Sequence, residues 1–138
     1  MIDTSGHPLY RLDLDVRWGD MDALGHVNNC LYFRYFEQTR VAWYASLGIA
    51  AGGAREMTVV VDNHAEYLRP LVHPARATVR MAGRDPGRSS FVSTYELEAG
   101  GELCTRGSAK IVWVDVASGR STPLPERVRR LLGETPRA

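Results

Sequence analysis

The chain has 138 residues and a mass of 15.3 kDa, which is the length of one domain and excludes separate cofactor and substrate domains. Hydrophobic residues make up 44% and charged residues 24%, a composition typical of a globular protein and not of a disordered one. The formal net charge is only +1, too small for the phosphate attraction on which most nucleic-acid binding depends. We therefore expect one domain over residues 1–138 with no nucleic-acid partner.

The two cysteines, Cys30 and Cys104, belong to no CxxC pair and to no Cys/His set with metal-ligand spacing. This pattern predicts neither a disulfide framework nor a zinc site, and it favours a reducing compartment. Residues 1–15 include acidic side chains and lack the apolar core of a secretory signal. No stretch approaches the ~20 apolar residues of a membrane helix, so we expect a cytoplasmic protein without a membrane partner.

The first predicted element is a strand over residues 10–18, in which apolar side chains alternate with charged ones. Its apolar members are Tyr10, Leu12, Leu14, Val16 and Trp18. The next residues read GDMDALGHVNN, which is rich in Gly, Asp and Asn and therefore typical of a turn. Asn28 or Asn29 can cap a helix that follows this turn.

A helix is predicted over residues 30–47, which contain no Pro or Gly. Its apolar face includes Tyr32, Phe36, Trp43 and Leu47, so the helix faces the core over about five turns. Gly48 follows directly and can end the helix in a left-handed conformation.

The remaining residues predict four strands and a short terminal helix. The strands cover residues 57–68, 75–84, 89–99 and 102–116, and the helix lies within residues 123–132 around Val128, Leu131 and Leu132. The short connections favour antiparallel neighbours, which makes the fold α+β. One helix covers only part of a five-stranded sheet and leaves strand edges open, so we expect the chain to associate with at least one further copy.

The densest polar cluster lies on the turn between the first strand and the long helix. It consists of Asp20, Asp22, His26, Asn28 and Asn29. One interpretation is structural: the aspartates make turn hydrogen bonds, Gly25 takes a positive φ and the asparagines cap the helix. The other is a reactive site, because such groups gather on loops held by a rigid scaffold.

Residues 16–40 read VRWGDMDALGHVNNCLYFRYFEQTR. They closely resemble the opening signature of the hotdog-fold acyl-CoA thioesterases of the 4-hydroxybenzoyl-CoA thioesterase type, in which an aspartate, a glycine and an asparagine-containing turn precede an aromatic helix with Glu-x-x-Arg. The resemblance implies a five-stranded antiparallel sheet wrapped around one long helix. It also implies hydrolysis of an acyl-CoA to a carboxylic acid and free coenzyme A by a homodimer or homotetramer, without a metal or another cofactor.

The resemblance also assigns roles within the turn. Asp22 takes the position of the catalytic carboxylate, which either attacks the thioester carbonyl or activates a water, and Asp20 is the less favoured candidate. The main-chain N–H of Asn29, with that of Asn28 near it, matches the donors that polarise the carbonyl. His26 and the Asn28 side chain orient a water or the carboxylate, unless they serve only as a packed imidazole and a cap.

Two further positions allow alternative interpretations. One hotdog subgroup places its catalytic glutamate on the long helix, a role that Glu37 would then take, but the spacing of Glu37 from Arg40 predicts an ordinary (i, i+3) ion pair, which we favour. His64 and Glu66 share one face of a predicted strand, where one of them lines the acyl pocket or the histidine is simply part of the core.

Coenzyme A carries phosphates, so a nearly neutral protein needs local cations to bind it. The segment GRSSF resembles the basic and hydroxyl-rich segment that contacts the nucleotide in related enzymes. This predicts substrate-binding roles for Arg84, Arg88, Ser89 and Ser90, although a solvated hairpin has the same composition.

Three functions are therefore compared: an acyl-CoA thioesterase, a non-catalytic acyl-thioester binding protein and a hotdog dehydratase. Asp22 favours the thioesterase, whose substrate is either a CoA or a carrier-protein thioester. The acyl group is not evident from the sequence, because side chains that face each other across a subunit interface shape the pocket.

Overall fold

The structure is a computed structural model of the whole chain, and it describes residues 1–49 and 55–133. Its strands are β1 (His7–Val16), β2 (Glu56–Tyr67), β3 (Ala75–Arg84), β4 (Ser90–Ala99) and β5 (Glu102–Asp115). Its helices are the one-turn η1 (Trp18–Asp20), the long α1 (Leu31–Ser46) and the short α2 (Glu126–Leu131).

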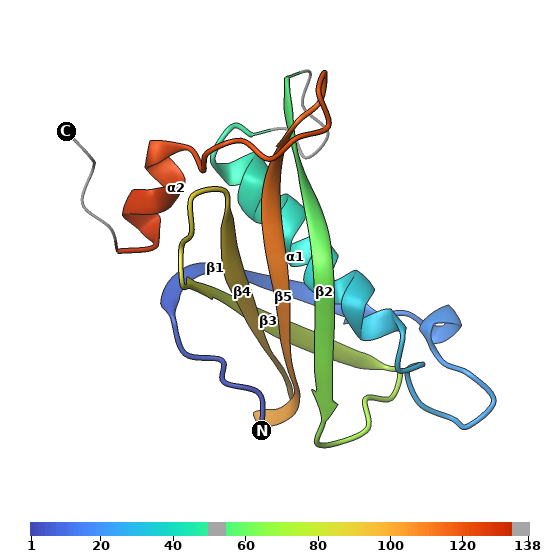
Figure 1. Cartoon of the computed structure of the whole chain (residues 1–138). Helices are drawn as coiled ribbons and strands as arrows, with labels where there is room; N and C mark the ends of the chain where they lie inside the picture. The colour runs from blue at the N-terminus through green and yellow to red at the C-terminus, as the bar shows by residue number, and fades with distance from the viewer. Residues whose placement is uncertain (50–54, 134–138) are drawn as a thin grey trace.

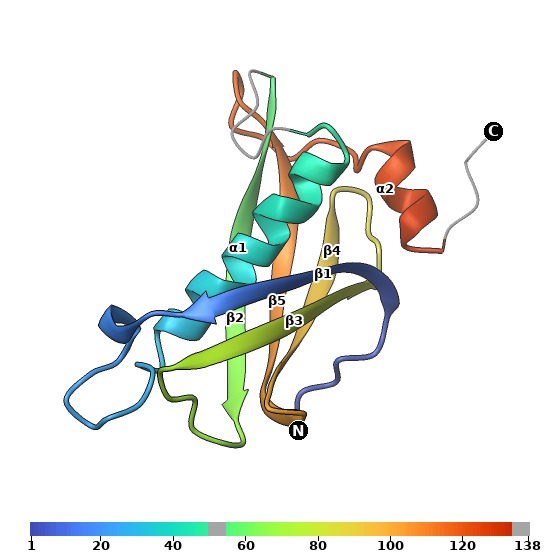
Figure 2. The ribbon, with the colours of Figure 1, turned by 180° about the vertical axis from the view of Figure 1, so that it is seen from behind.

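The five strands form one antiparallel sheet in the order β1-β3-β4-β5-β2 (Figure 1). The sheet curves around α1, which runs across its concave face beside β5 and β2 (Figure 2). This arrangement confirms the predicted α+β class and the hotdog fold. Strands β1 and β2 are the two edges of the sheet, and Tyr67 at the end of β2 contacts the residues just before α1.

The predicted bounds of the later elements agree with the structure. Residues 57–68, 75–84, 89–99 and 102–116 correspond to β2, β3, β4 and β5, and each bound differs by at most one residue. The long helix is likewise one residue shorter at each end. Gly48 follows it with a φ of +72°, and the Ile49 N–H donates to the Tyr44 carbonyl, which confirms the predicted helix end.

The prediction for the end of the first strand was wrong. β1 ends at Val16, and Trp18 lies in η1 with 75% of its surface exposed. The chain bends here because the Asp20 N–H donates to the Arg17 carbonyl while the Asp20 carboxylate accepts the Arg17 N–H. This local hydrogen-bonded turn prevents continuation of the two-residue alternation.

The core lies between α1 and the concave face of the sheet. Phe36 on α1 stacks on Tyr95 of β4 with ring centroids 4.6 Å apart, and both side chains are fully buried. Gly107 on β5 leaves room for this ring, because a Cβ at that position would overlap Phe36. Three residues of the predicted apolar helix face are buried, namely Tyr32, Phe36 and Trp43. The fourth, Leu47, is only partly buried, because the helix ends there.

The C-terminal helix α2 packs against the β3–β4 hairpin. Arg129 donates through Nη2 to the carbonyls of Gly87 and Arg88, at 2.7 and 2.8 Å. The predicted terminal helix is confirmed, and of the apolar residues named for it Val128 and Leu132 are buried whereas Leu131 is exposed. In the described part of the chain, neither the length nor the apolar character of any helix suits it to crossing a membrane.

Candidate active site

The turn between η1 and α1 is anchored to the rest of the fold. Met21 pairs with Val27 in an isolated β-bridge, and the Val27 N–H donates to the Leu71 carbonyl at 2.8 Å. Gly25 has a φ of +85°, a conformation that favours glycine. The turn is therefore held on both sides, and the groups on it have defined positions.

Asp22 is a half-buried carboxylate that accepts two hydrogen bonds. The Leu24 N–H donates to Oδ1 and the Asn28 side-chain amide donates to Oδ2, each at 2.9 Å. These two donors, with a smaller contribution from nearby His26, lower the pKa of Asp22 below its ordinary value of 3.8. The carboxylate is therefore ionised at neutral pH.

Asn28 connects this carboxylate to the start of α1. Its side-chain oxygen accepts the Cys30 N–H at 2.9 Å, and its carbonyl accepts the Leu31 N–H. The N-cap of α1 is Cys30 and has no side-chain capping hydrogen bond, so the prediction that Asn28 or Asn29 caps the helix was wrong, and Asn28 instead orders the turn before the helix. The Asn29 N–H has no hydrogen-bond acceptor among the described residues, so this donor is available to a ligand.

Asp20 has a different environment from Asp22. It is 6% exposed, and its Oδ2 accepts the Tyr35 hydroxyl at 2.8 Å. Burial and this hydrogen bond to the carboxylate raise the pKa of Tyr35. The contacts of Asp20 link η1 to α1, and they give it a structural role within the chain.

A cavity of about 230 Å³ opens beside Asn29. His26 and Asn29 line it together with Tyr32, Tyr67 and Arg69. The Tyr67 hydroxyl donates to the Asn29 carbonyl, and its ring meets that of Tyr32 edge to face at 5.0 Å. The end of β2 thus forms one wall and the start of α1 the other.

The residues at the end of β2 were not predicted from the sequence to belong to the site. Tyr67 looked like an ordinary member of a strand, and Arg69 looked like part of a connecting loop. The position of the loop before β3 was the signal that could have identified them. Val16 at the end of β1 pairs with Ala75 at the start of β3, so this loop lies close to the turn that follows β1. Arg69 is the cation beside the cavity, and it lies 3.5 Å from the carboxylate of Glu102.

The expected ion pair between Glu37 and Arg40 is absent, which corrects our structural interpretation of this spacing. Arg40 points into the core and donates through Nη1 to the Tyr95 hydroxyl at 2.8 Å. Glu37 points outward and lies 3.9 Å from Arg34. The spacing allowed a pair on one helix face, but the burial of the Arg40 side chain against β4 separates the two charges.

His64 lies on the sheet face opposite α1. Its pairing partner Ser108 follows Gly107, which faces α1, so alternation turns both Ser108 and His64 away from the helix. The imidazole is exposed and lies 3.8 Å from Asp62. Within one copy, His64 therefore does not line the cavity at Asn29, and the proposal that it is a core histidine was wrong.

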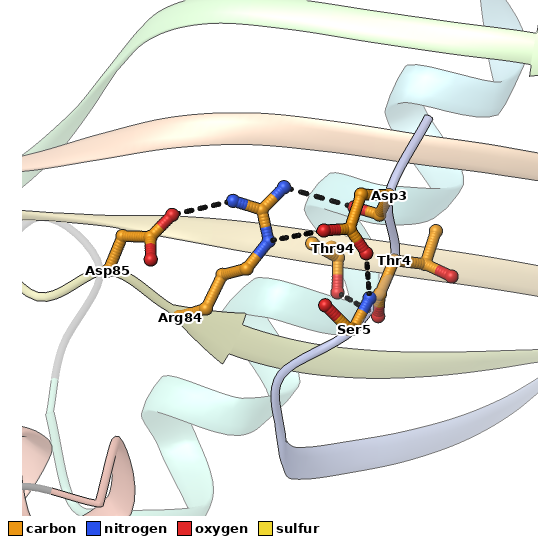
Figure 3. Close-up of polar contacts among 6 residues, drawn as sticks. All are labelled: Asp3, Thr4, Ser5, Arg84, Asp85 and Thr94. Carbon is orange, nitrogen blue, oxygen red and sulfur yellow. Dashed lines mark hydrogen bonds and ion pairs between the residues drawn. The ribbon is translucent and has the colours of Figure 1, made fainter. Parts of the chain in front are cut away.

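Arg84 is held by anionic groups of its own chain (Figure 3). Its Nη1 pairs with the Asp85 carboxylate at 2.7 Å, its Nη2 donates to the Asp3 carbonyl at 3.0 Å, and its Nε lies 4.0 Å from the Asp3 carboxylate. The Thr94 hydroxyl holds the same N-terminal segment through the Thr4 carbonyl. Of the two arginines predicted to bind the nucleotide, Arg84 is therefore less available to a phosphate than Arg88.

The other three predicted nucleotide contacts lie on the hairpin between β3 and β4. Arg88 is exposed, and its side chain forms no ion pair among residues 1–49 and 55–133, while Ser89 and Ser90 are half-buried. The hairpin follows the end of β3 that pairs with His7, whereas the turn with Asp22 lies near the other end of this strand (Figure 1). Within one copy the two groups are therefore not adjacent.

Comparisons with known proteins agree with this fold. The model of the thioesterase-like superfamily matches residues 16–132, so the chain belongs to this superfamily and is a thioester hydrolase. The match begins at the segment whose resemblance to hotdog thioesterases was noted in the sequence, and the family assignment is confirmed.

Three relatives illustrate the similarity. The PA2801 protein of Pseudomonas aeruginosa, a proposed thioesterase, is 44% identical, with a TM-score of 0.85 over 89% of this chain and 97% of that one. A thioesterase of Thermus thermophilus, solved with coenzyme A and Zn, is 31% identical, with a TM-score of 0.80 over 94% and 98% of the two chains. The uncharacterized protein YsmA of Bacillus subtilis is 29% identical over 88% of this chain and 84% of its own.

Proposed function

We propose that the protein hydrolyses an acyl-CoA to a carboxylic acid and free coenzyme A, with Asp22 as nucleophile or general base. The observation that carries the proposal is an ionised carboxylate linked through Asn28 to the helix start where the Asn29 N–H is free. The cavity beside Asn29 can take the thioester group. The related thioesterase from Thermus thermophilus, which was solved with coenzyme A, supports CoA as the carrier.

The proposed reaction uses only groups of the chain. The Asn29 N–H donates to the thioester oxygen as negative charge develops on it, and the α1 dipole favours that charge. In one version Asp22 removes a proton from a water that attacks the carbonyl carbon. In the other, Asp22 attacks directly and water then hydrolyses the resulting anhydride. In both, the C–S bond breaks and the coenzyme A sulfur leaves as a thiolate that takes up a proton.

We further propose that two copies pair through the free edge of β2. Met57, Val60 and Val61 on this edge are 37%, 39% and 55% exposed, and a second β2 strand would cover them. In a two-fold pair the β2 strands run antiparallel, so the Tyr67 end of one copy lies beside the Glu56 end of the other. A dimer is the smallest assembly that closes this edge, and a tetramer is two such dimers.

This pairing offers a route by which the predicted nucleotide contacts reach the site. Glu56 pairs with Asp115 of β5, and Val112 of the same strand pairs with Ser90 at the start of β4. The β3–β4 hairpin of one copy would thus lie toward the Asn29 cavity of the other. In this arrangement Arg88, Ser89 and Ser90 of one copy and Arg69 of the other approach the phosphates.

A thiol-release assay tests the proposed function. Purified protein is incubated with short, long and aromatic acyl-CoAs, and free thiol is measured over many turnovers. We expect release with at least one of these classes, and loss of release in Asp22→Asn. Binding of acyl-CoA without release would instead identify a binding protein. Release restricted to carrier-protein thioesters would replace coenzyme A with a carrier protein.

A further inference from the structure

Arg40 is a buried cation for which the described residues provide no anionic partner. The residue is 6% exposed, and none of the ion pairs among residues 1–49 and 55–133 involves it. Its Nη1 donates to the Tyr95 hydroxyl, which donates to Ser93 Oγ, which donates to the Ala109 carbonyl. This hydrogen-bonded chain fixes the guanidinium in place but contains no negative charge, so the charge of Arg40 is left uncompensated.

Arg40 is also among the residues that line a cavity of about 400 Å³ between α1 and the edge strand β2. Phe33, Glu37 and Arg40 line it from α1, and Val60 and Asn63 line it from β2. This cavity therefore lies along the edge at which we propose that two copies meet, where α1 and β2 run side by side (Figure 2).

Glu37 is an anion in the same cavity with no firm partner of its own. Its side chain is 53% exposed, and the nearest cation, Arg34 at 3.9 Å, is 72% exposed. An ion pair between two such mobile and solvated side chains contributes little. The lining of the cavity thus includes one buried cation and one exposed anion, next to an open strand edge.

We propose that in the dimer Glu37 of each copy enters the cavity of the other and pairs with its Arg40. A two-fold interface brings the same surface of both copies together, so a surface that carries one cation and one anion is complementary to itself. Each dimer then contains two equivalent ion pairs, and both buried charges are compensated. The inference rests on the proposed pairing of β2 edges and is independent of the chemistry at Asp22.

A charge-exchange experiment tests the proposal. It uses two variants of the chain that differ in mass, so that homodimers and heterodimers can be told apart. Glu37→Arg in one chain and Arg40→Glu in the other each place like charges across the interface of a homodimer. In the mixed dimer, both pairs again join opposite charges. We expect each single variant to dimerise at least about tenfold more weakly than the wild type. The mixture should form more heterodimer than random exchange gives, measured by native mass spectrometry.

The exchange separates pairing between copies from pairing within one chain. If Glu37 instead turned to Arg40 of its own helix, each variant chain would keep its repulsion in any dimer, and heterodimers would not be favoured. Such random mixing would overturn the proposal. Arg80 and Glu98 provide the matched control, because their 2.6 Å ion pair joins two strands of one chain. The same exchange at Arg80 and Glu98 should give random mixing.

A milder pair of variants covers the case in which Arg40→Glu fails to fold. Glu37→Gln and Arg40→Met should weaken dimerisation to a similar extent, and the double variant should weaken it little further, because either change alone removes the pair. Dimers that are unaffected by all three would overturn the proposal. Unchanged dimers in Arg40→Met, with a selective loss of activity on acyl groups that carry a distal anion, would assign Arg40 to the substrate instead.

Discussion

The Asn28 side chain holds the Asp22 carboxylate and Cys30, the N-cap residue of α1, in one hydrogen-bonded unit. Its amide nitrogen donates to Asp22 Oδ2 while its oxygen accepts the Cys30 N–H, and both distances are 2.9 Å. Because one planar amide makes both bonds, the carboxylate cannot shift relative to the helix start without breaking one of them. The carboxylate and the free Asn29 N–H are thus held in a constant relationship, as proximity catalysis requires.

We expect Asp22→Asn to lower kcat by about 10²-fold or more, since the amide can neither attack a carbonyl nor remove a proton from water. The fold should persist, because an amide oxygen can still accept the Leu24 N–H. Steady-state thiol release and circular dichroism measure the two effects. Asp20→Asn is the comparison: its buried contacts with Tyr35 and Arg17 predict a lower Tm and a much smaller loss of kcat. Equal kcat in Asp22→Asn and the wild type would contradict the assignment.

The pH dependence of kcat/KM tests the role of Asn28. The active form of Asp22 is the carboxylate, so activity falls as the pH drops through its pKa, which lies below 3.8. Asn28→Ala removes the second-largest of the contributions that lower this pKa, so the acidic limb of the profile should move to higher pH. The exposed Asp15 is a suitable control, since Asp15→Asn leaves the Asp22 hydrogen bonds intact. An acidic limb at the same pH in Asn28→Ala and the wild type would argue against Asp22 as the titrating group.

Arg84 and Arg88 should differ in their effect on KM. The guanidinium of Arg84 is already paired with Asp85 and Asp3, whereas that of Arg88 is open to a phosphate. Arg88→Ala should raise KM for an acyl-CoA several-fold at low ionic strength and less at high salt, because ions screen an exposed contact. Arg84→Ala should change KM little.

A pantetheine thioester that lacks the nucleotide serves as the control substrate for this comparison. Its KM should be the same for Arg88→Ala and the wild type. If instead Arg84→Ala raised KM for the acyl-CoA and Arg88→Ala did not, the nucleotide would lie against Arg84, and the N-terminal segment would have to move aside.

Gly107→Ala should destabilise the fold by about 1–3 kcal/mol, because the added methyl group overlaps the Phe36 ring, which is stacked on Tyr95 and cannot retreat. Chemical denaturation measures the free energy of unfolding. Gly19→Ala is the matched control, since a Cβ at Gly19 meets nothing within 4 Å, and the change should be within about 0.5 kcal/mol. Phe36→Leu combined with Gly107→Ala should cost less than the two single changes added together.

Many features of the fold were predictable because they depend on residues that are close in sequence. Local periodicity predicted the strands β2 to β5 and the helix α1, and their bounds in the structure differ from the predicted ones by at most one residue. Backbone preference predicted the left-handed conformation of Gly48. The surroundings of Asp22 within the turn were predictable for the same reason, since the hydrogen bonds of Asp22 join residues at most six positions apart.

Other features depend on contacts between distant residues, which local patterns do not encode. The sheet order brings Tyr67 to Asn29 across 38 positions, and this contact lies in a cavity wall that local sequence patterns did not predict. Tertiary packing also made Asp20 a buried structural residue, turned Arg40 to Tyr95 across 55 positions and tied Arg84 to Asp3 across 81. The sequence by itself determined which groups form the turn and the helix start. Only the tertiary structure decided which charges are buried, paired or open, because burial and pairing depend on the segments that the sheet order brings together.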